Sequence, residues 1–296
     1  MRVPHCIKKP LQQLISPRLY QQITTEVRLF LTPKARCLDL CRSLLRHKEG
    51  FEIGGPSFIF SRKGLLPVYR IAGRVDNCNF SNNTIWEGSI CEGAHFKFDA
   101  SKPAGYQFIR EAVDLHGIPS HRYDFILSSH NIEHVANAIK ALREWLRILK
   151  EDGILVVVFP HKDGTFDRNR PVTPLEHYRE DYERGMGEDD LTHFHEIKSL
   201  HDAGIDMELG DVTEFIQRCE NNIEHRCIHH HVFDTRAAVA LLDHVGVQIC
   251  AVEALLPMHI VVVAKKLPDG QTPDNLWYLD GTPHCLSGSP FPSDHR

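Results

Sequence analysis

Two short apolar runs in the middle of the chain are separated by a segment with a helical pattern. Residues 123–128 and 154–159 are nearly continuous apolar runs, which is typical of strands that are buried on both faces of a parallel sheet. Between them, apolar residues recur every three or four positions over 135–149, which predicts a helix with one buried face. A strand, a helix and a second strand in this order form a βαβ unit, whose ligand crevice lies at the carboxyl ends of the strands. We therefore expect residues 128–134 to line a pocket.

The same patterns predict further elements on both sides of this unit. Before it we expect helices within 11–48, a strand at 51–55, a strand that ends at Asp76, and a helix over 106–112. After it we expect a helix over 234–245 and strands over 247–254 and 259–265. Strands that alternate with helices predict an α/β fold around a mostly parallel sheet. The length of 296 residues and the hydrophobic content of 42% are sufficient for such a core.

Three segments lie outside this pattern and divide the chain. Residues 1–48 are basic and are expected to form an N-terminal helical segment. Residues 161–231, which we call the insert, are polar and rich in histidine, and a loop of this length without structure is unusual in a compact domain. We therefore expect helices in the insert and a role as a lid over a substrate. Residues 267–296 are rich in Pro, Gly and Ser and are expected to form a mobile or loosely packed tail, which leaves 49–266 as the main domain.

The βαβ unit resembles that of the class I S-adenosylmethionine-dependent methyltransferases. In that family a Tyr-Asp strand ends in small polar residues and a Glu-His pair, a helix ends in Leu-Arg-x-Leu-Lys-x-x-Gly, and a strand runs from Gly through apolar residues to Pro. This chain has Tyr123–Val135, Leu146–Gly153 and Gly153–Pro160 in the same order. The phrases at Glu52–Ser57 and His229–Asp234 resemble a divergent subgroup of the type 11-like methyltransferases.

The resemblance covers roughly residues 50–266 and implies a Rossmann-like methyltransferase fold. It implies a mostly parallel seven-stranded sheet with helices on both faces and the His-rich helical insert after the fifth strand. The implied activity is in-line methyl transfer from S-adenosylmethionine to a small-molecule or glycan-linked acceptor. Because a fold does not fix a function, two other functions stay open. One is a non-catalytic binding module with this fold, and the other is a metal-dependent hydrolase that uses the insert.

Candidate cofactor-binding residues follow the first two strands of the domain. Glu52 ends the first strand, and Gly54 and Gly55 let the backbone approach a ligand closely. Asp76 follows about twenty residues later, where a carboxylate accepts the ribose hydroxyls in a Rossmann-type site. An alternative for Asp76 is a turn-forming role. Pro56 departs from the G-x-G loop of the family.

The resemblance implies further contacts to the cofactor at the next strand ends. Asp114 and Leu115 stand where family members hold the adenine amino group, and Ser128 and Ser129 would border the sulfonium. A serine at a strand end can instead satisfy backbone groups. The expected site therefore depends on acidic and small residues that converge along one edge of the sheet.

Histidines are the candidates for the base that removes a proton from the acceptor. His130 follows the strand at 123–128 and His161 follows the strand at 154–159, and histidine is the usual general base near neutral pH. The histidines of the insert match no specific metal-binding spacing, so we expect a polar pocket without a metal and keep metal ligation as an alternative. Arg168 and Arg170 either hold an anionic group of the acceptor or pair with nearby carboxylates.

The net charge and the cysteine content limit the possible binding partners and the cellular compartment of the protein. The net charge of −5 gives no overall attraction to nucleic acid, and no apolar run is long enough to span a bilayer. The nine cysteines are scattered without a Cys-x-x-Cys pair, which favours a reducing cytoplasm over a disulfide framework. We therefore expect a cytoplasmic enzyme whose partner is a small-molecule or saccharide acceptor.

Overall fold

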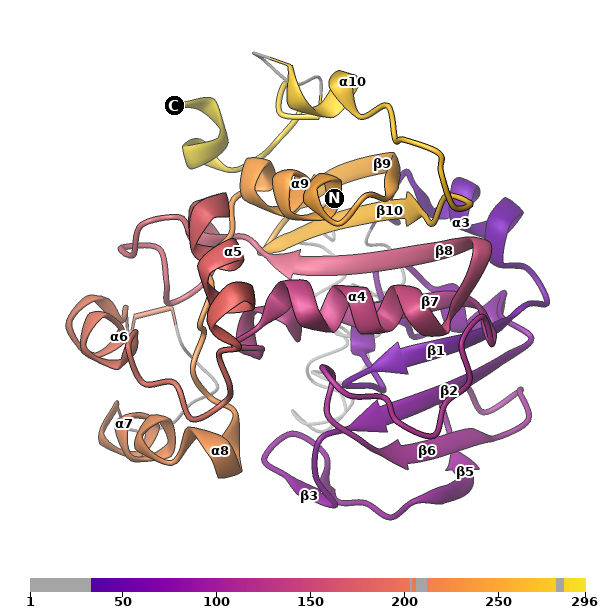
Figure 1. Cartoon of the computed structure of the whole chain (residues 1–296), viewed down its shortest axis with the longest axis horizontal. Coiled ribbons are helices and arrows are strands. Elements are labelled where there is room, and N and C mark those ends of the chain that lie inside the picture. The colour runs from indigo at the N-terminus through magenta and orange to yellow at the C-terminus, as the bar shows by residue number, and fades with distance from the viewer. Residues whose placement is uncertain (1–32, 203, 206–211, 281–284) are drawn as a thin grey trace, which may run out of the picture.

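The computed structural model describes residues 33–202, 204–205, 212–280 and 285–296, so the helices expected within 11–32 lie outside the described residues. An eight-stranded sheet with the order β5-β6-β2-β1-β7-β8-β10-β9 forms the centre of the molecule (Figure 1). The strands of this sheet are β1 (Glu49–Ile53), β2 (Arg74–Asn79), β5 (Gly93–Phe96), β6 (Gly105–Ile109), β7 (Tyr123–Ser129), β8 (Leu149–Pro160), β9 (Gln248–Leu255) and β10 (His259–Lys265). A separate small hairpin consists of β3 (Asn83–Thr84) and β4 (Gly88–Ser89).

The five central strands of the sheet are parallel. β6, β2, β1, β7 and β8 run in one direction, whereas β10 is antiparallel to β8, β9 to β10, and β5 to β6. This arrangement confirms the expected α/β fold with a mostly parallel sheet. The expected number of seven strands is wrong by one, because the short strand β5 pairs with the free edge of β6.

The described helices occupy the faces and one end of the sheet. They are α3 (Leu38–Leu45), α4 (Ala138–Ile148), α5 (Leu175–Arg184), α6 (Phe194–Leu200), α7 (Val212–Glu220), α8 (Asn222–His225), α9 (Thr235–His244) and α10 (Leu276–Leu279). The expected helix over 234–245 is confirmed as α9, and the side chain of Asp234 caps it by accepting the N–H of Ala237 (2.7 Å). Among the described residues, no helix has both the length and the apolar character needed to cross a bilayer.

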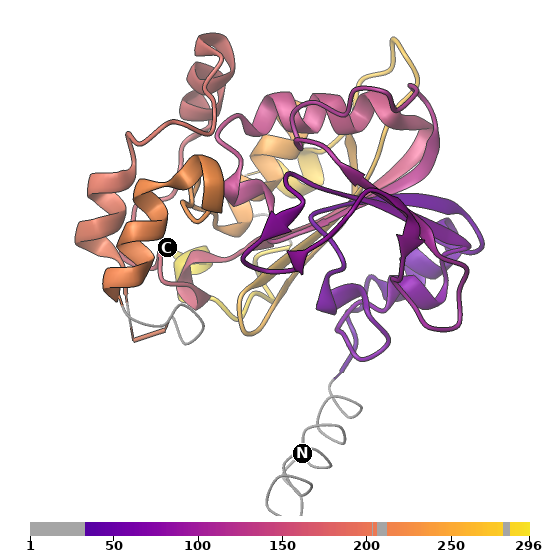
Figure 2. The ribbon, with the colours of Figure 1, turned by 90° about the horizontal axis from the view of Figure 1, so that it is seen from below.

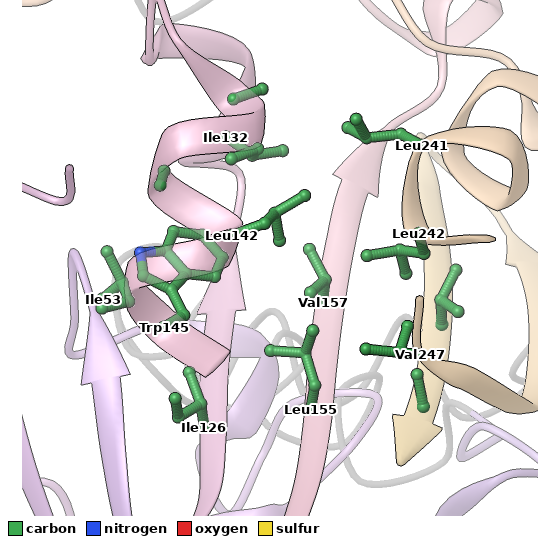
Figure 3. Close-up of a cluster of buried hydrophobic side chains, with 14 of the residues drawn as sticks. Ile53, Ile126, Ile132, Leu142, Trp145, Leu155, Val157, Leu241, Leu242 and Val247 are labelled. Carbon is green, nitrogen blue, oxygen red and sulfur yellow. The ribbon is translucent and has the colours of Figure 1, made fainter. Parts of the chain in front are cut away.

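Helices α4 and α9 cover one face of the sheet and form the larger core with it. Figure 3 shows Leu142 and Trp145 of α4 above Ile53, Ile126 and Leu155 of the strands, and all five side chains are buried. The apolar positions of α4 recur at the spacing of one helix face, so burial of that face against the sheet is what stabilises it. This packing fixes the position of the β7–α4 loop, in which Ser129 is followed by the short 3-10 helix Ile132–His134.

The opposite face of the sheet is covered by the segment before β2. The buried side of α3 packs with residues 58–72 against Phe125, Val156 and Val261. The carboxylate of Glu253 on β9 accepts the backbone N–H groups of Arg36 (3.0 Å) and Cys37 (3.1 Å). The start of α3 is thereby anchored to the edge of the sheet.

The insert contains α5 to α8, which confirms the expectation that it carries helices. In Figure 1 the arrows of β1, β2, β6 and β8 point toward α6, α7 and α8. Figure 2 shows these helices grouped at one end of the molecule. They share a small core of their own, made of Ile197, Phe215, Cys219, Cys227 and Ile228. The insert therefore lies beyond the carboxyl ends of the parallel strands, where a ligand crevice is expected.

Two predicted elements before β7 are wrong. Residues 105–109 form strand β6 and not the start of a helix, because the run Gly-Tyr-Gln-Phe-Ile pairs with β2 and buries alternate side chains. The strand predicted to end at Asp76 continues to Asn79. Asn77, Asn79 and Gln107 bond to one another there, so that polar side chains are satisfied inside the sheet.

The end of the chain is packed, which corrects the expectation of a loose tail. Leu286 and Phe291 are buried, and the carboxylate of Asp294 accepts the backbone N–H of Thr235 (3.1 Å) and the hydroxyls of Thr235 (2.7 Å) and Ser289 (2.6 Å). A few apolar anchors and satisfied polar groups are sufficient to dock this segment without long helices or strands.

Candidate active site

A glycine turn follows β1 at the carboxyl edge of the sheet. Gly54 has a φ of +76°, and a Cβ at this position would lie 2.7 Å from the side-chain nitrogen of Asn131 in the β7–α4 loop. The amide of Asn77 holds Gly55 on both sides, accepting its N–H (2.9 Å) and donating to its carbonyl (3.0 Å). The turn after β1 therefore lies against the β7–α4 loop, and a side chain at Gly54 would not fit there.

Glu52 lies beneath this turn and is fully buried. Its carboxylate accepts the hydroxyl of Tyr69 (2.6 Å) and the backbone N–H of Ser57 (3.1 Å). A Cβ at Gly55 would lie 2.3 Å from the same carboxylate. Burial raises the pKa of Glu52 to about 7, although the hydrogen bonds from Tyr69 and Ser57 oppose this rise. Glu52 thus stabilises the shape of the turn from below.

The raised pKa of Glu52 predicts a pH-dependent contribution to stability. The unfolded chain releases this proton near pH 4.5, whereas the folded chain keeps it up to about pH 7, so the contribution is present below pH 4.5 and is lost as the pH rises through 7. Glutamine does not ionise, so Glu52→Gln is expected to remove this pH-dependent loss of stability. At pH 8 the free energy of unfolding of the variant is expected to be higher than that of the wild type by on the order of 3 kcal/mol.

Urea unfolding at pH 5 and pH 8 measures this difference. The titratable groups that act on Glu52 are Tyr69, through a hydrogen bond, and Glu87, through its charge. The Glu52→Gln variant and the wild type both retain these two residues. An equal gap between the two proteins at both pH values would contradict the prediction.

Asp76 does not lie with Glu52. In the register of the sheet Asp76 is paired with Phe51, whereas Glu52 is paired with Asn77, so the side chains of Glu52 and Asp76 point to opposite faces. The carboxylate of Asp76 is buried and accepts the hydroxyl of Tyr123 (2.9 Å) and the backbone N–H of Tyr106 (2.8 Å). The expectation that these two acids converge on one ligand is therefore wrong.

The bonds of Asp76 predict a structural role that can be separated from cofactor binding. We expect Asp76→Asn to lower the free energy of unfolding by about 1–3 kcal/mol, because an amide cannot satisfy all of the donors that the carboxylate accepts. The Kd for S-adenosylhomocysteine, measured by calorimetry, is expected to stay within about twofold of the wild type. A large loss of affinity for S-adenosylhomocysteine, with an unchanged free energy of unfolding, would instead indicate that Asp76 binds the ribose of the cofactor.

The residues expected at the adenine end are also separated from the glycine turn. The Asp114 side chain is 63% exposed and accepts the N–H of His116 (3.2 Å) in a turn. Leu115 is fully buried, and its N–H donates to the carboxylate of Glu144 on α4 (2.9 Å). Asp114 therefore faces solvent and does not share a cleft with Glu52 or Asp76.

Arg226 of the insert lies at the ends of β2 and β6. Its guanidinium bonds to Glu111 (2.6 Å) and Glu188 (3.0 Å) and lies over the ring of Phe80 (4.9 Å to the centroid). Glu111 follows β6 and Phe80 follows β2, so this one side chain connects the insert to the carboxyl edge of the sheet. No pattern in the sequence indicated this contact.

The end of β7 carries polar atoms without partners. Ser129 is half-buried, whereas the hydroxyl of Ser128 and the side-chain oxygen of Asn131 are buried and have no hydrogen-bond partner among the described residues. Buried polar atoms without partners are uncommon and often mark a place for a ligand or water. Residues 128–134, where a pocket is expected, thus contain unsatisfied acceptors.

His130 and His161, the predicted bases, lie in different surroundings. His130 has a φ of +48° and bonds through Nε2 to Nδ1 of His259 (2.9 Å), and burial lowers its pKa to about 3. The ring of His161 is fully buried, stacks on Phe291 (3.9 Å between centroids) and lies 3.3 Å from the carboxylate of Asp294. The C-terminal segment therefore encloses His161, which leaves no access for an acceptor.

A third histidine, His229, meets the β7–α4 loop from the other end of the insert. Its Nδ1 lies 2.5 Å from a carboxylate oxygen of Asp167, and its ring packs edge-on against that of His134 (4.5 Å between centroids). Burial opposes the ionisation of Asp167, but contact with His229 and Arg170 lowers the pKa of Asp167 below its usual value. Asp167 is therefore ionised and orients the His229 ring, as in catalytic Asp–His pairs.

Glu133 and His134 complete this group at the end of β7. The Glu133 side chain is 1% exposed, and one of its oxygens has no hydrogen-bond partner among the described residues. Burial raises the pKa of Glu133 to about 7, and burial and His229 hold the pKa of His134 well below its usual value. We refer to Glu133, His134, Asp167 and His229 as the β7 cluster. The sequence showed the Glu-His pair and the three consecutive histidines, but not that they meet.

A second group of histidines lies beside the β7 cluster. Nε2 of His231 lies 3.1 Å from the carboxylate of Asp181 on α5, and Nε2 of His177 lies 3.0 Å from Nε2 of His193. The His231 ring stacks on that of Tyr178 (4.5 Å between centroids). These side chains are largely bonded to one another and form a polar layer that connects α5 to the end of the insert.

The two arginines of the insert pair with carboxylates. Arg170 is 1% exposed and donates to Asp167 (2.8 Å) and Glu196 (2.7 Å). Arg168 lies 2.5 Å from the carboxylate of Asp202. Of the two alternatives for these arginines, ion pairing within the protein is therefore confirmed.

Comparisons with known proteins agree with this architecture. Residues 76–157, which run from β2 through β7 and α4 to β8, match the family model described as a methyltransferase domain. Together with the mostly parallel sheet described above, this match supports a methyltransferase domain in this part of the chain.

Solved structures similar to this chain include three methyltransferases with low sequence identity. One from Methanosarcina mazei is 16% identical with a TM-score of 0.45, covering 78% of this chain and 98% of that one. One from Mesorhizobium loti is 14% identical with a TM-score of 0.44, covering 78% and 98%. A 1,6-didemethyltoxoflavin-N1-methyltransferase from Burkholderia thailandensis, bound to S-adenosylhomocysteine, is 12% identical with a TM-score of 0.41, covering 90% and 94%. The search of curated proteins found no match.

Proposed function

We propose that the protein transfers a methyl group from S-adenosylmethionine to an oxygen or nitrogen atom of a small-molecule or saccharide acceptor. The acceptor binds between the β7–α4 loop and the insert. The observation that carries this proposal is the β7 cluster, in which the insert brings the Asp167–His229 pair against Glu133 and His134. Hydroxyl and amine acceptors must lose a proton during transfer, and such a cluster is suited to that task.

The carboxyl edge of the sheet fits the methyl donor, although with a different set of residues from the expected one. The turn at Gly54 and Gly55 provides backbone without side-chain bulk, and Ser128 and Asn131 supply the unpaired polar atoms beside it. We propose that these residues and Ser129 hold the cofactor, with Glu52 stabilising the turn. S-adenosylmethionine supplies an electrophilic methyl group, and the protein aligns the acceptor with it and excludes water.

The charges of the insert support a neutral or cationic acceptor. A surface pocket of about 300 Å³ opens between α7–α8 and the residues before α6. Its lining includes the carboxylates of Glu188, Asp189, Glu220 and Glu224 and no Lys or Arg. Glu188 also approaches His230, within 3.7 Å of its Nε2, so the pocket adjoins the polar interior of the insert. An acidic lining repels phosphate and carboxylate groups and is compatible with amines and polyols.

Two measurements test the proposed function. Calorimetry with S-adenosylhomocysteine is expected to give saturable binding to the wild type and at least tenfold weaker binding to Asn131→Ala. A labelled methyl donor, incubated with a panel of monosaccharides, polyols and primary amines, is expected to label members of that panel. Absence of S-adenosylhomocysteine binding would refute the cofactor site, and absence of label on every member of the panel would refute the acceptor class.

We also propose a cytoplasmic location. All eight cysteines in the described part of the chain are free, and five of them are buried. Free thiols in this number are typical of a reducing compartment.

A further inference from the structure

Three potential metal ligands of the β7 cluster converge at one point. One carboxylate oxygen of Glu133 and one ring nitrogen each of His134 and His229 lie within 4.8 Å of one another. Nε2 of His134 is 4.0 Å from the Glu133 carboxylate. An ion with bonds of about 2.0–2.2 Å holds neighbouring ligand atoms about 3–3.5 Å apart, so small side-chain rotations bring these three onto one ion.

The outer ring nitrogens of both histidines are already engaged. Nδ1 of His134 is 3.2 Å from the carbonyl oxygen of Ile228, and Nδ1 of His229 is 2.5 Å from the carboxylate of Asp167. A carbonyl and an ionised carboxylate only accept hydrogen bonds, so both histidines carry a proton on Nδ1 and leave Nε2 as a lone pair. Metal-binding histidines are oriented by this same kind of outer contact.

The carboxylate of Glu133 adds a third acceptor beside the two Nε2 lone pairs. It is 1% exposed, and its second oxygen has no hydrogen-bond partner among the described residues. Two buried acceptors and one half-buried acceptor that face one another without a donor are unfavourable, and a cation between them removes this cost. The arrangement therefore has the electrostatic character of a cation site.

The neighbouring group of His177, Asp181 and His231 is a weaker candidate. Its atoms also lie within 4.8 Å of one another, but they bond within the protein, since His231 pairs with Asp181 and His177 with His193. These contacts satisfy the ligand atoms without an ion. Both groups include histidines of the insert, so each can serve as the control for the other.

We propose that Glu133, His134 and His229 bind a divalent transition-metal ion, with zinc favoured by the two imidazoles and one carboxylate. Three protein ligands leave a position open, and the ligands lie at the end of β7, where the acceptor is proposed to bind. An ion there lowers the pKa of a bound acceptor hydroxyl and orients it. This catalytic role rests on the proposed function, whereas metal binding itself does not.

Metal binding is tested on the tag-free, full-length protein. Elemental analysis is expected to find about one zinc per chain, and Co²⁺ added to the metal-depleted protein is expected to give the visible absorption of a low-coordinate site. Glu133→Gln and His229→Ala are expected to weaken Co²⁺ binding at least tenfold. Asp167→Asn is expected to weaken it about 10–100-fold through the orientation of His229.

Two matched substitutions serve as controls. His195→Ala changes an exposed histidine of α6, and Asp181→Asn changes the neighbouring group, so both are expected to leave Co²⁺ binding within about twofold. Thermal unfolding of each metal-depleted variant reports whether it folds, and calorimetry with S-adenosylhomocysteine reports the cofactor site separately. If the wild type binds Co²⁺ but not S-adenosylhomocysteine, the proposed function is refuted and the metal site is not.

Two outcomes would overturn the metal site. The first is a wild type that contains no metal, does not bind Co²⁺ and keeps full methyl transfer in the presence of a chelator, which would leave His229 as a general base. The second is loss of Co²⁺ binding in Asp181→Asn but not in Glu133→Gln, which would move the ion to the neighbouring group.

Discussion

His229→Ala will lower kcat for methyl transfer by about 10²–10⁴-fold, the usual contribution of a positioned group that handles the acceptor's proton. His229 is 6% exposed, and its ring is oriented by Asp167 and its carbonyl by Arg170 (2.9 Å). Alanine removes the only lone pair that the Asp167 contact leaves available. The loss is expected whether that lone pair takes a proton or binds a metal ion.

The cofactor affinity separates this effect from a general loss of structure. His229 lies in the insert and not at the glycine turn, so the Kd for S-adenosylhomocysteine is expected to stay within about twofold. His195→Ala, on the exposed side of α6, is the matched control and should leave both quantities unchanged. Single-turnover kinetics with a labelled methyl donor measure the chemical step directly. A His229→Ala enzyme with wild-type turnover would exclude His229 from the reaction.

Gly54→Ala is expected to weaken S-adenosylhomocysteine binding by at least 30-fold, because two costs coincide at this residue. The φ of +76° is unfavourable for any residue with a Cβ, at roughly 1–2 kcal/mol, and the new Cβ would lie 2.7 Å from the Asn131 side chain. Relief of that contact displaces Asn131, which we propose as a cofactor ligand. The same change therefore strains the turn and moves its neighbour.

Gly246→Ala provides a control with the same backbone cost. Gly246 has a φ of +81° beyond the end of α9, and a Cβ there would meet no atom within 4 Å. Both variants are expected to lose similar stability in thermal unfolding, whereas only Gly54→Ala should lose affinity in calorimetry. Equal affinity of the two variants would show that the turn after β1 does not contact the cofactor.

The parts of the fold that depend on local pattern could be predicted from the sequence. The strand at His259–Lys265 was predicted with both of its bounds, and α4, α9, β7 and β8 were predicted within a few residues. Each of these has either an uninterrupted apolar run or a clear helical repeat, so its burial is decided by neighbouring residues. The cap of α9 at Asp234 is likewise a local interaction, which joins residues three positions apart.

The side chains of the candidate site could not be placed in this way. Asp76 was assigned by its distance along the chain, but a single residue of strand register decides which face it occupies, and the strand extends to Asn79. His161 was assigned by its position after β8, but Phe291, far along the chain, covers it. Contacts between residues that are distant in sequence depend on the completed packing, and no short motif encodes them.

The insert leaves and rejoins the sheet at nearly the same place. His161 and Phe233 form a bridge, and the N–H of Lys162 donates to the carbonyl of Phe233 (2.9 Å). Because the two ends of the insert are adjacent, the insert can be replaced or lengthened without changes in the strands that flank it. Closing a longer loop costs little additional entropy. Changes in the insert can therefore alter which acceptor binds, while the proposed site for the methyl donor at the carboxyl edge of the sheet stays the same.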